Sequence, residues 1–322
     1  MLSTIHDVPL SVPWIGTNRS IRVYHFGKRS CGPKIYLQAG LHADEPSGML
    51  ILHHLIKLLE ARDDEPCGEI IIVPCSNPVG LAQRMQGYQA GRSDLGIGGN
   101  FNRNFPDVSA LLGERLAALK NGGRAIDEAT VRLALKELVE TLVPKTELES
   151  LKKSLLGLAI DADYVLDLHS DDDSGVYAFV SNPEHPATDL LSRHIGSVVT
   201  VGGLNGGLAF KDSCFLPWRV AQDFFPEASR TGCLAATLEY RGTRDVRDDL
   251  AIEDAKGLIG FMESAGILHP TEPWTTQATP FNTSRDCVDY VQASVPGIIV
   301  FSTAPGERVS IGEEVAHTLN PA

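Results

Sequence analysis

Apolar and polar positions along the chain alternate with two different periods. Short apolar runs typical of strands occur at 35–38, 69–74, 164–169, 174–181 and 233–240. Apolar residues at helical spacing occupy the segments 48–60, 108–120, 124–142, 147–160, 186–196 and 250–264. Strands and helices that alternate in this way favour an α/β fold on a parallel or mixed sheet. We therefore predict a mixed, largely parallel sheet flanked by helices.

The pattern changes near residue 268. The segment 269–274 reads His-Pro-Thr-Glu-Pro-Trp, which has the composition of a linker. After it come short, Val-rich runs separated by turn residues, which favour strands over helices. We predict two domains, an α/β domain at 1–268 and a small all-β module at 269–322.

Composition narrows the class of protein. Of 322 residues, 43% are hydrophobic and 21% charged, an ordinary composition for a soluble globular chain. The 28 Lys and Arg against 41 Asp and Glu give a net charge of −13, which argues against nucleic-acid or anionic-membrane partners. No apolar run approaches the roughly 18 residues of a membrane span. We expect neither nucleic acid nor a membrane as partner, and no secretory signal is visible at the amino terminus.

The six cysteines are scattered and lack C-x-x-C spacing. Such usage favours reduced thiols and a cytoplasmic protein. A nucleophilic cysteine stays an alternative, although none lies in a recognisable motif. Buried structural thiols are the favoured interpretation.

The first candidate chemistry is at His42 and Glu45, three residues apart in a loop that follows the predicted strand 35–38. Ligands in α/β sheets usually bind at the carboxyl ends of strands, so the pair lies where a site is expected. A His-x-x-Glu pair also occurs by chance in many proteins. It needs a third ligand to indicate a metal site.

His169 supplies that ligand, because it ends the apolar strand 164–169. Two His and one Glu are a common catalytic zinc set that leaves one position open for water. Asp167 points to the same face of its strand as His169 and can orient that ligand. Helix capping or a contact with a buried arginine is an equally good interpretation of Asp167.

Hydrolysis of an amide also needs a general base and a way to hold the substrate. Glu239 ends the apolar strand 233–240 and is the candidate base, although a carboxylate there is often only an edge charge. Asn102 and Arg103 lie in a loop dense in amide and guanidinium donors, suited to binding a carboxylate. The alternative is a loop in which Arg103 pairs with an acidic neighbour.

These elements together resemble the succinylglutamate desuccinylase and aspartoacylase family of the zinc carboxypeptidase superfamily. The resemblance covers roughly residues 35–265. Its motifs are Gly-Leu-His-Ala-Asp-Glu at 40–45, Asn-Pro-Val-Gly at 77–80, Asn-Arg-Asn-Phe-Pro at 102–106, Asp-Leu-His at 167–169 and Leu-Glu at 238–239. Each motif is weak alone, and their common order is fairly specific.

The resemblance implies one zinc ion per chain, held by His42, Glu45 and His169. It implies that Glu239 is general base and then proton donor. It also implies that Asn102 and Arg103 hold the free carboxylate of a small N-acyl substrate.

For the arginine that polarises the substrate carbonyl, the resemblance favours Arg92 over Arg84. The tail resembles a small β-barrel module. Such a module usually has further strands, so either this version is minimal or another segment or a partner completes it.

The predicted function is zinc-dependent hydrolysis of the amide bond of an N-acyl amino acid or a related small N-acyl amine. Two alternatives stay open: a metallocarboxypeptidase acting on short peptides, and a non-catalytic metal-binding module. Exposed strands in the tail also make a homo-oligomer possible. The sequence leaves undetermined which acyl group and which amine are accepted.

Overall fold

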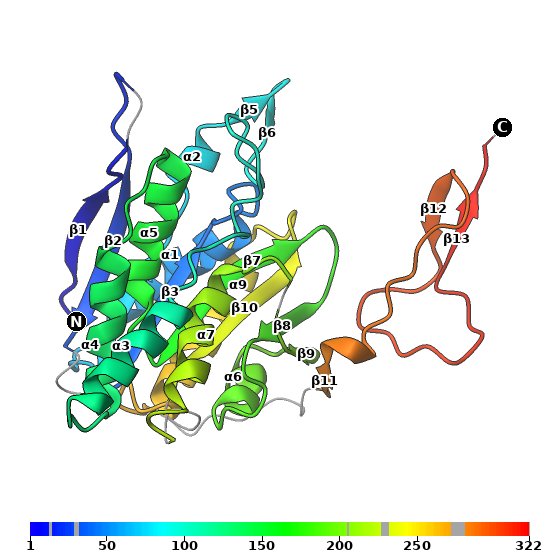
Figure 1. The fold of residues 1–322 in the computed structure, drawn as a ribbon. Coiled ribbons are helices and arrows are strands. Elements are labelled where there is room, and N and C mark those ends of the chain that lie inside the picture. The colour runs from blue at the N-terminus through cyan, green and yellow to red at the C-terminus, as the bar shows by residue number, and fades with distance from the viewer. Residues whose placement is uncertain (13–14, 29–31, 205, 227–231, 272–280, 322) are drawn as a thin grey trace.

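The fold was analysed in a computed structural model that describes residues 1–12, 15–28, 32–204, 206–226, 232–271 and 281–321. A mixed sheet of nine strands forms its centre, with helices on both faces (Figure 1). The strands, in spatial order, are β1 (Thr4–Pro9), β2 (Ser20–Gly27), β4 (Glu69–Val73), β3 (Lys34–Ala39), β7 (Tyr164–Asp171), β10 (Leu234–Gly242), β8 (Val176–Val180), β9 (Val199–Gly202) and β11 (Phe281–Ser284). This architecture confirms the predicted α/β class.

The middle of the sheet is parallel. β4, β3, β7 and β10 all run in one direction, whereas β2 and β8 pair antiparallel to their neighbours β4 and β10. The predicted strands at 35–38, 69–74, 164–169, 174–181 and 233–240 are present with small changes at their ends. Since β3, β7 and β10 are adjacent and parallel, their carboxyl ends meet at one edge of the sheet.

Two apolar layers hold helices against the sheet. One layer packs beneath α3 (Ser109–Asn121), α4 (Glu128–Glu140), α5 (Glu147–Ala159) and α7 (Phe210–Ala221). The other packs beneath α1 (Ser47–Glu60), α6 (Thr188–His194) and α9 (Asp248–Ser264). Within β3 the alternation is clear, because Tyr36 contributes to the first layer and Ile35 and Leu37 to the second. The helices expected at 108–120, 124–142 and 147–160 therefore cover one face of the sheet.

Smaller elements complete the chain. They are α2 (Pro78–Leu81), the two-residue strands β5 (Arg84–Met85) and β6 (Tyr88–Gln89), the 3-10 helix η2 (Arg285–Cys287), and the hairpin strands β12 (Ile298–Phe301) and β13 (Ala316–Leu319). Figure 1 draws the hairpin of β12 and β13 apart from the helix-covered sheet. The small C-terminal antiparallel β module is therefore present, whereas the division into 1–268 and 269–322 stays a prediction. The second half of the expected linker, residues 272–274, lies outside the described residues.

Two further features bear on the sequence-based expectations. Within the described residues, none of the helices combines the length and apolar character of a membrane span. The five cysteines in those residues are free thiols, and Cys214 and Cys233 are buried among apolar side chains. Cys31 lies outside the described residues.

Candidate metal centre and surrounding cavity

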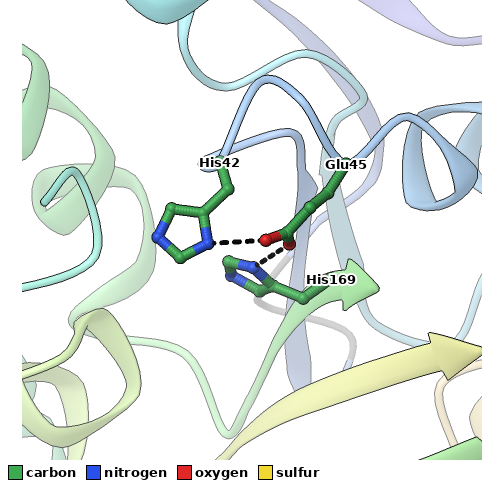
Figure 2. A group of neighbouring side chains, drawn as sticks. All are labelled: His42, Glu45 and His169. Atoms are coloured by element: carbon green, nitrogen blue, oxygen red, sulfur yellow. Dashed lines mark hydrogen bonds and ion pairs between the residues drawn. The ribbon is translucent and has the colours of Figure 1, made fainter. Parts of the chain in front are cut away.

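The loop after β3 carries two of the three predicted metal ligands. Gly40 starts it with φ at +70°, a conformation that glycine adopts readily, and the chain then turns toward α1. Glu45 directs its carboxylate between the rings of His42 and His169 (Figure 2). Its Oε1 lies 2.9 Å from Nδ1 of His42, and its Oε2 lies 2.7 Å from Nδ1 of His169. The three side chains therefore converge, as the sequence predicts.

The donor set fits a metal ion. One ligand atom from each of His42, Glu45 and His169 can be chosen so that all lie within 4.8 Å of one another, and all three residues are buried. Two imidazole nitrogens and a carboxylate oxygen are ligands that zinc prefers. The residues thus form a candidate metal centre at the carboxyl ends of β3 and β7.

The charges around this cluster favour a cation. Burial acts to raise the pKa of Glu45, but the charge of His169 and hydrogen bonds from both histidines outweigh it and hold that pKa well below its usual range. Burial acts to lower the pKa of His169, and the carboxylates of Asp167 and Glu45 raise it overall. A buried carboxylate on each side of one imidazole stabilises positive charge there, as a proton or as a metal ion.

Asp167 contacts the second nitrogen of the His169 ring. Its Oδ2 lies 2.9 Å from His169 Nε2, and its Oδ1 accepts a hydrogen bond of 2.9 Å from Gln38 Nε2. Of the interpretations open for Asp167, the contact that orients His169 is the one that the structure contains. Such a contact leaves His169 Nδ1 directed at Glu45.

Glu239 lies beside His169, because β10 pairs in parallel with β7 and the two residues are register partners. Burial raises the pKa of Glu239 to about 7, the charges of Glu45, Asp171 and Asp167 add to this, and His169 opposes it. A carboxyl group with a raised pKa can accept and later return a proton near neutral pH. Glu239 and the metal-ligand candidates line one cavity.

Arg92 reaches the same place from a neighbouring loop. The amide of Ala43 donates to the carbonyl of Gly91 over 3.0 Å, and a Cβ at Gly91 would lie 2.3 Å from the amide nitrogen of Asp44, so only glycine permits this approach. The loops are thereby held together, and Arg92 Nη1 donates to Glu45 Oε1 over 3.0 Å. Arg84 instead donates to Gln89 Oε1 on the neighbouring β6.

Asn102 and Arg103 also line the cavity. The backbone amide of Phe210 donates to Asn102 Oδ1 over 2.8 Å, which directs Asn102 Nδ2 toward Asp167 Oδ2 at 3.3 Å. Arg103 donates to the carbonyl of Asn102, and Lys152 of α5 donates to the carbonyl of Arg103 over 2.6 Å. α5 therefore supports this loop. Within the described contacts, Arg103 does not use the alternative pairing with an acidic neighbour.

The cavity has a volume of about 210 Å³. Sequence reasoning missed several side chains that line it. They are Tyr177 and Phe179 of β8, Thr237 of β10, and Arg285 and Tyr290 from the C-terminal segment. Alternation along β8 could have indicated the first two. Nothing local in the sequence marks Arg285 or Tyr290, because pairing of β11 with β9 brings that segment to the cavity.

Fold and cluster together define an α/β protein with a buried candidate metal site at the carboxyl ends of adjacent parallel strands. The model of the succinylglutamate desuccinylase/aspartoacylase catalytic domain matches residues 31–264. The chain belongs to this family, as its motifs predict.

Known proteins similar to this chain agree with that placement. The N-alpha-acetyl-L-2,4-diaminobutyric acid deacetylase of Halomonas elongata is 25% identical over 299 residues, which are 90% of this chain and 71% of that protein. A family protein from Shewanella amazonensis has a similar fold, with a TM-score of 0.84 at 24% identity over 99% of this chain and 87% of that one. A family protein from Shewanella frigidimarina has a TM-score of 0.85 at 22% identity over 99% and 86%.

Proposed function

We propose that this protein is a zinc-dependent hydrolase that cleaves the amide bond of an N-acyl amino acid or a related small N-acyl amine. One observation carries the proposal: Glu239 and the His42–Glu45–His169 cluster line a single small cavity together with Arg103. The family and the deacetylase of Halomonas elongata support the reaction class. The five cysteines within the described residues form no disulfide, which supports a cytoplasmic location.

His42, Glu45 and His169 would hold one zinc ion per chain, in keeping with their donor atoms. When bound, zinc lowers the pKa of water and polarises a substrate carbonyl. The carboxylate of Glu239 takes a proton from the attacking water and later gives it to the nitrogen of the leaving amine. Both steps use one carboxylate, so Glu239 ends each turnover in the state in which it began.

Two groups of donors would hold the substrate. The guanidinium of Arg103, with the amide of Asn102 beside it, would bind the free carboxylate of the amino acid. Arg92 would donate to the carbonyl oxygen as negative charge develops on it. Arg92 is preferred to Arg84 because it lines the cavity and already contacts Glu45.

Cavity size favours a deacylase over a carboxypeptidase. A peptidase needs an open groove for the rest of its peptide, whereas this cavity has a volume of about 210 Å³ and is lined in part by Arg285 and Tyr290 of the C-terminal segment. The presence of Glu239 in the cavity argues against a metal-binding module without catalysis. We therefore expect small N-acyl compounds to be better substrates than peptides.

The test is a hydrolysis assay of the zinc-loaded protein with N-acetyl, N-succinyl and N-formyl amino acids and with short peptides. At least one N-acyl amino acid should be hydrolysed faster than the peptides. Glu239→Gln should lower kcat by roughly 10²–10⁴-fold while the zinc content stays the same. Glu253→Gln, at an exposed position of α9, is the matched control and should keep full activity. Full activity in Glu239→Gln would exclude this mechanism.

A further inference from the structure

Arg285 enters the cavity from a part of the chain beyond the family-matched residues 31–264. It is the first residue of η2 and directly follows β11. β11 pairs in parallel with β9, so that Ser284 is the register partner of Gly202. Strand pairing at the edge of the main sheet therefore fixes the backbone immediately before Arg285. This pairing places Arg285 at the cavity.

The loop after β9 gives two arginines room to lie against it. Gly203 has φ at +128°, and a Cβ there would lie 3.7 Å from Cβ of Arg285. Gly207 has φ at +87°, and a Cβ there would lie 3.1 Å from Cδ of Arg103. Positive φ values of this kind favour glycine. Arg285 and Arg103 thus approach one loop at two glycines and line the same cavity.

A buried lysine, paired with an aspartate, lies near these arginines. Lys211, near the start of α7, is fully buried, and its Nζ donates to Asp212 Oδ1 over 2.8 Å and to the carbonyl of Gly203 over 3.1 Å. Burial lowers the pKa of Lys211, Asp212 opposes this, and the charges of Arg285 and Arg103 lower it further. Both guanidinium groups therefore lie within electrostatic reach of one ammonium group.

Three carboxylates also line the cavity. Glu45 lies in the loop after β3, Glu239 lies within β10, and Asp171 is the last residue of β7. Asp171 and the ionised form of Glu239 repel a substrate carboxylate, whereas the guanidinium groups attract it. Charge therefore favours placing the substrate carboxylate beside the arginines.

We propose that Arg285 is a second carboxylate-binding residue, which together with Arg103 holds the free carboxylate of the substrate between two guanidinium groups. The inference rests on the proposed function and extends its site to the C-terminal segment. Arg103 uses its contact with the Asn102 carbonyl for only part of a fork of five N–H donors. A carboxylate between two guanidinium groups accepts charge-assisted hydrogen bonds from both and offsets their mutual repulsion. The site would therefore reject N-acyl amines that lack a carboxylate.

The test compares Arg285→Gln with the unchanged protein on matched pairs of compounds, an N-acyl amino acid and its carboxamide. The pair is built on the acyl amino acid that the protein hydrolyses fastest or, if none is hydrolysed, on N-acetyl-L-2,4-diaminobutyrate. Arg285→Gln should raise KM for the carboxylate about 10- to 100-fold, with a smaller change in kcat. It should leave the weak activity on the carboxamide nearly unchanged. Arg285→Lys should restore part of the loss.

Binding is measured separately by calorimetry in the Glu239→Gln background, where turnover is blocked. Loss of carboxylate affinity when Arg285→Gln is added supports the inference. Because this result needs no hydrolysis, the inference can be tested even if the proposed function fails. Arg308→Gln, an exposed position in the same C-terminal region, is the control and should bind normally. Equal losses for the carboxylate and the carboxamide, unchanged binding in Arg285→Gln, or no binding of any carboxylate would each overturn the inference.

Discussion

At the scale of single residues, the candidate metal centre depends on a buried chain of hydrogen bonds that begins at Tyr36 of β3. The hydroxyl of Tyr36 donates to Gln38 Oε1 over 2.8 Å, and Gln38 Nε2 donates to Asp167 Oδ1 over 2.9 Å. With Oδ1 occupied, the other carboxylate oxygen of Asp167 faces His169 Nε2. These contacts favour the tautomer in which Nε2 of His169 carries the proton and donates to Asp167. The lone pair on Nδ1 is then free to bind a metal ion.

Gln38→Glu is expected to weaken zinc binding by about 10- to 100-fold. The substitution keeps the shape of the side chain but replaces the donor to Asp167 with a second acceptor, so Asp167 no longer has a fixed hydrogen bond toward His169. The measurement is zinc affinity by competition with a chelator, with circular dichroism to verify folding. Gln222→Glu, at the end of α7, is the control. An unchanged affinity in folded Gln38→Glu would show that this chain of hydrogen bonds does not position His169.

Sequence reasoning finds those site residues whose neighbours in the chain explain them. His42 and Glu45 share one loop, and Asp167 and His169 share one strand face, so spacing alone predicts that each pair lies together. Gln38 lies one residue before the end of β3, and its contact with Asp167 depends on the pairing of β3 with β7. The position of Arg285 depends on the pairing of β11 with β9. Contacts of this kind are set by strand order, which a single sequence does not determine.

At the scale of elements, the close packing of α1 against the sheet positions the loop that carries His42 and Glu45. Gly48, the second residue of α1, is the point of nearest approach. A Cβ there would lie 2.9 Å from Cβ of Leu168 and 3.1 Å from Cβ of Ala39. The helix therefore touches β3 and β7 next to the residues that bring the ligand candidates together.

Gly48→Ala is expected to lower the free energy of unfolding by about 1–3 kcal/mol, because the added methyl group overpacks this contact. Gly157→Ala in α5 is the matched control. A Cβ at Gly157 meets only Val139 Cγ1 at 3.6 Å, so the better helix propensity of alanine should stabilise the protein by about 0.5–1 kcal/mol. Urea denaturation of both variants measures the difference. Equal stabilities would contradict close packing at Gly48.

Elements with a clear apolar period were predictable, and elements without one were not. β1 is almost entirely exposed, and β9 has only four residues, so neither produces a strong pattern. α7 is buried around most of its surface and contains Pro217, which hides its helical period. The same helix brings Lys211 and the Phe210 amide to the site. Its absence from the predicted elements is why these contacts were missed.

At the scale of the whole molecule, the C-terminal hairpin exposes many apolar side chains. Ile298, Ile299 and Phe301 of β12 and Ile311 in the following turn are all more than half exposed in the single chain. A two-stranded hairpin is at best marginally stable alone, and exposed apolar patches commonly mark contact surfaces. We expect the predicted homo-oligomer to associate through this hairpin.

Phe301→Lys combined with Ile299→Lys is expected to lower the apparent mass in solution by weakening self-association through β12. Sedimentation at several protein concentrations is the measurement. Lysine substitution of Leu133, an exposed position on α4, provides the control and should leave the mass unchanged. A monomeric unmodified protein at high concentration would contradict association through this hairpin.

Whole-molecule organisation was partly predictable. Composition and periodicity predicted the α/β class, and the shift in pattern after 268 predicted a separate β-rich tail. β11 at the edge of the main sheet was not predicted, because its four residues carry no alternation and its partner β9 is equally short. Yet β11 is the element that carries Arg285 to the cavity.

The central claim is that His42, Glu45 and His169 hold the zinc used for hydrolysis. Its most direct test is elemental analysis of the purified protein and of His169→Ala, with His53→Ala at an exposed position of α1 as control. The account predicts one zinc ion per chain in the unmodified protein and in the control, and loss of both zinc and hydrolysis in His169→Ala. Full zinc content and activity in His169→Ala, or undiminished hydrolysis by the metal-stripped protein, would contradict it.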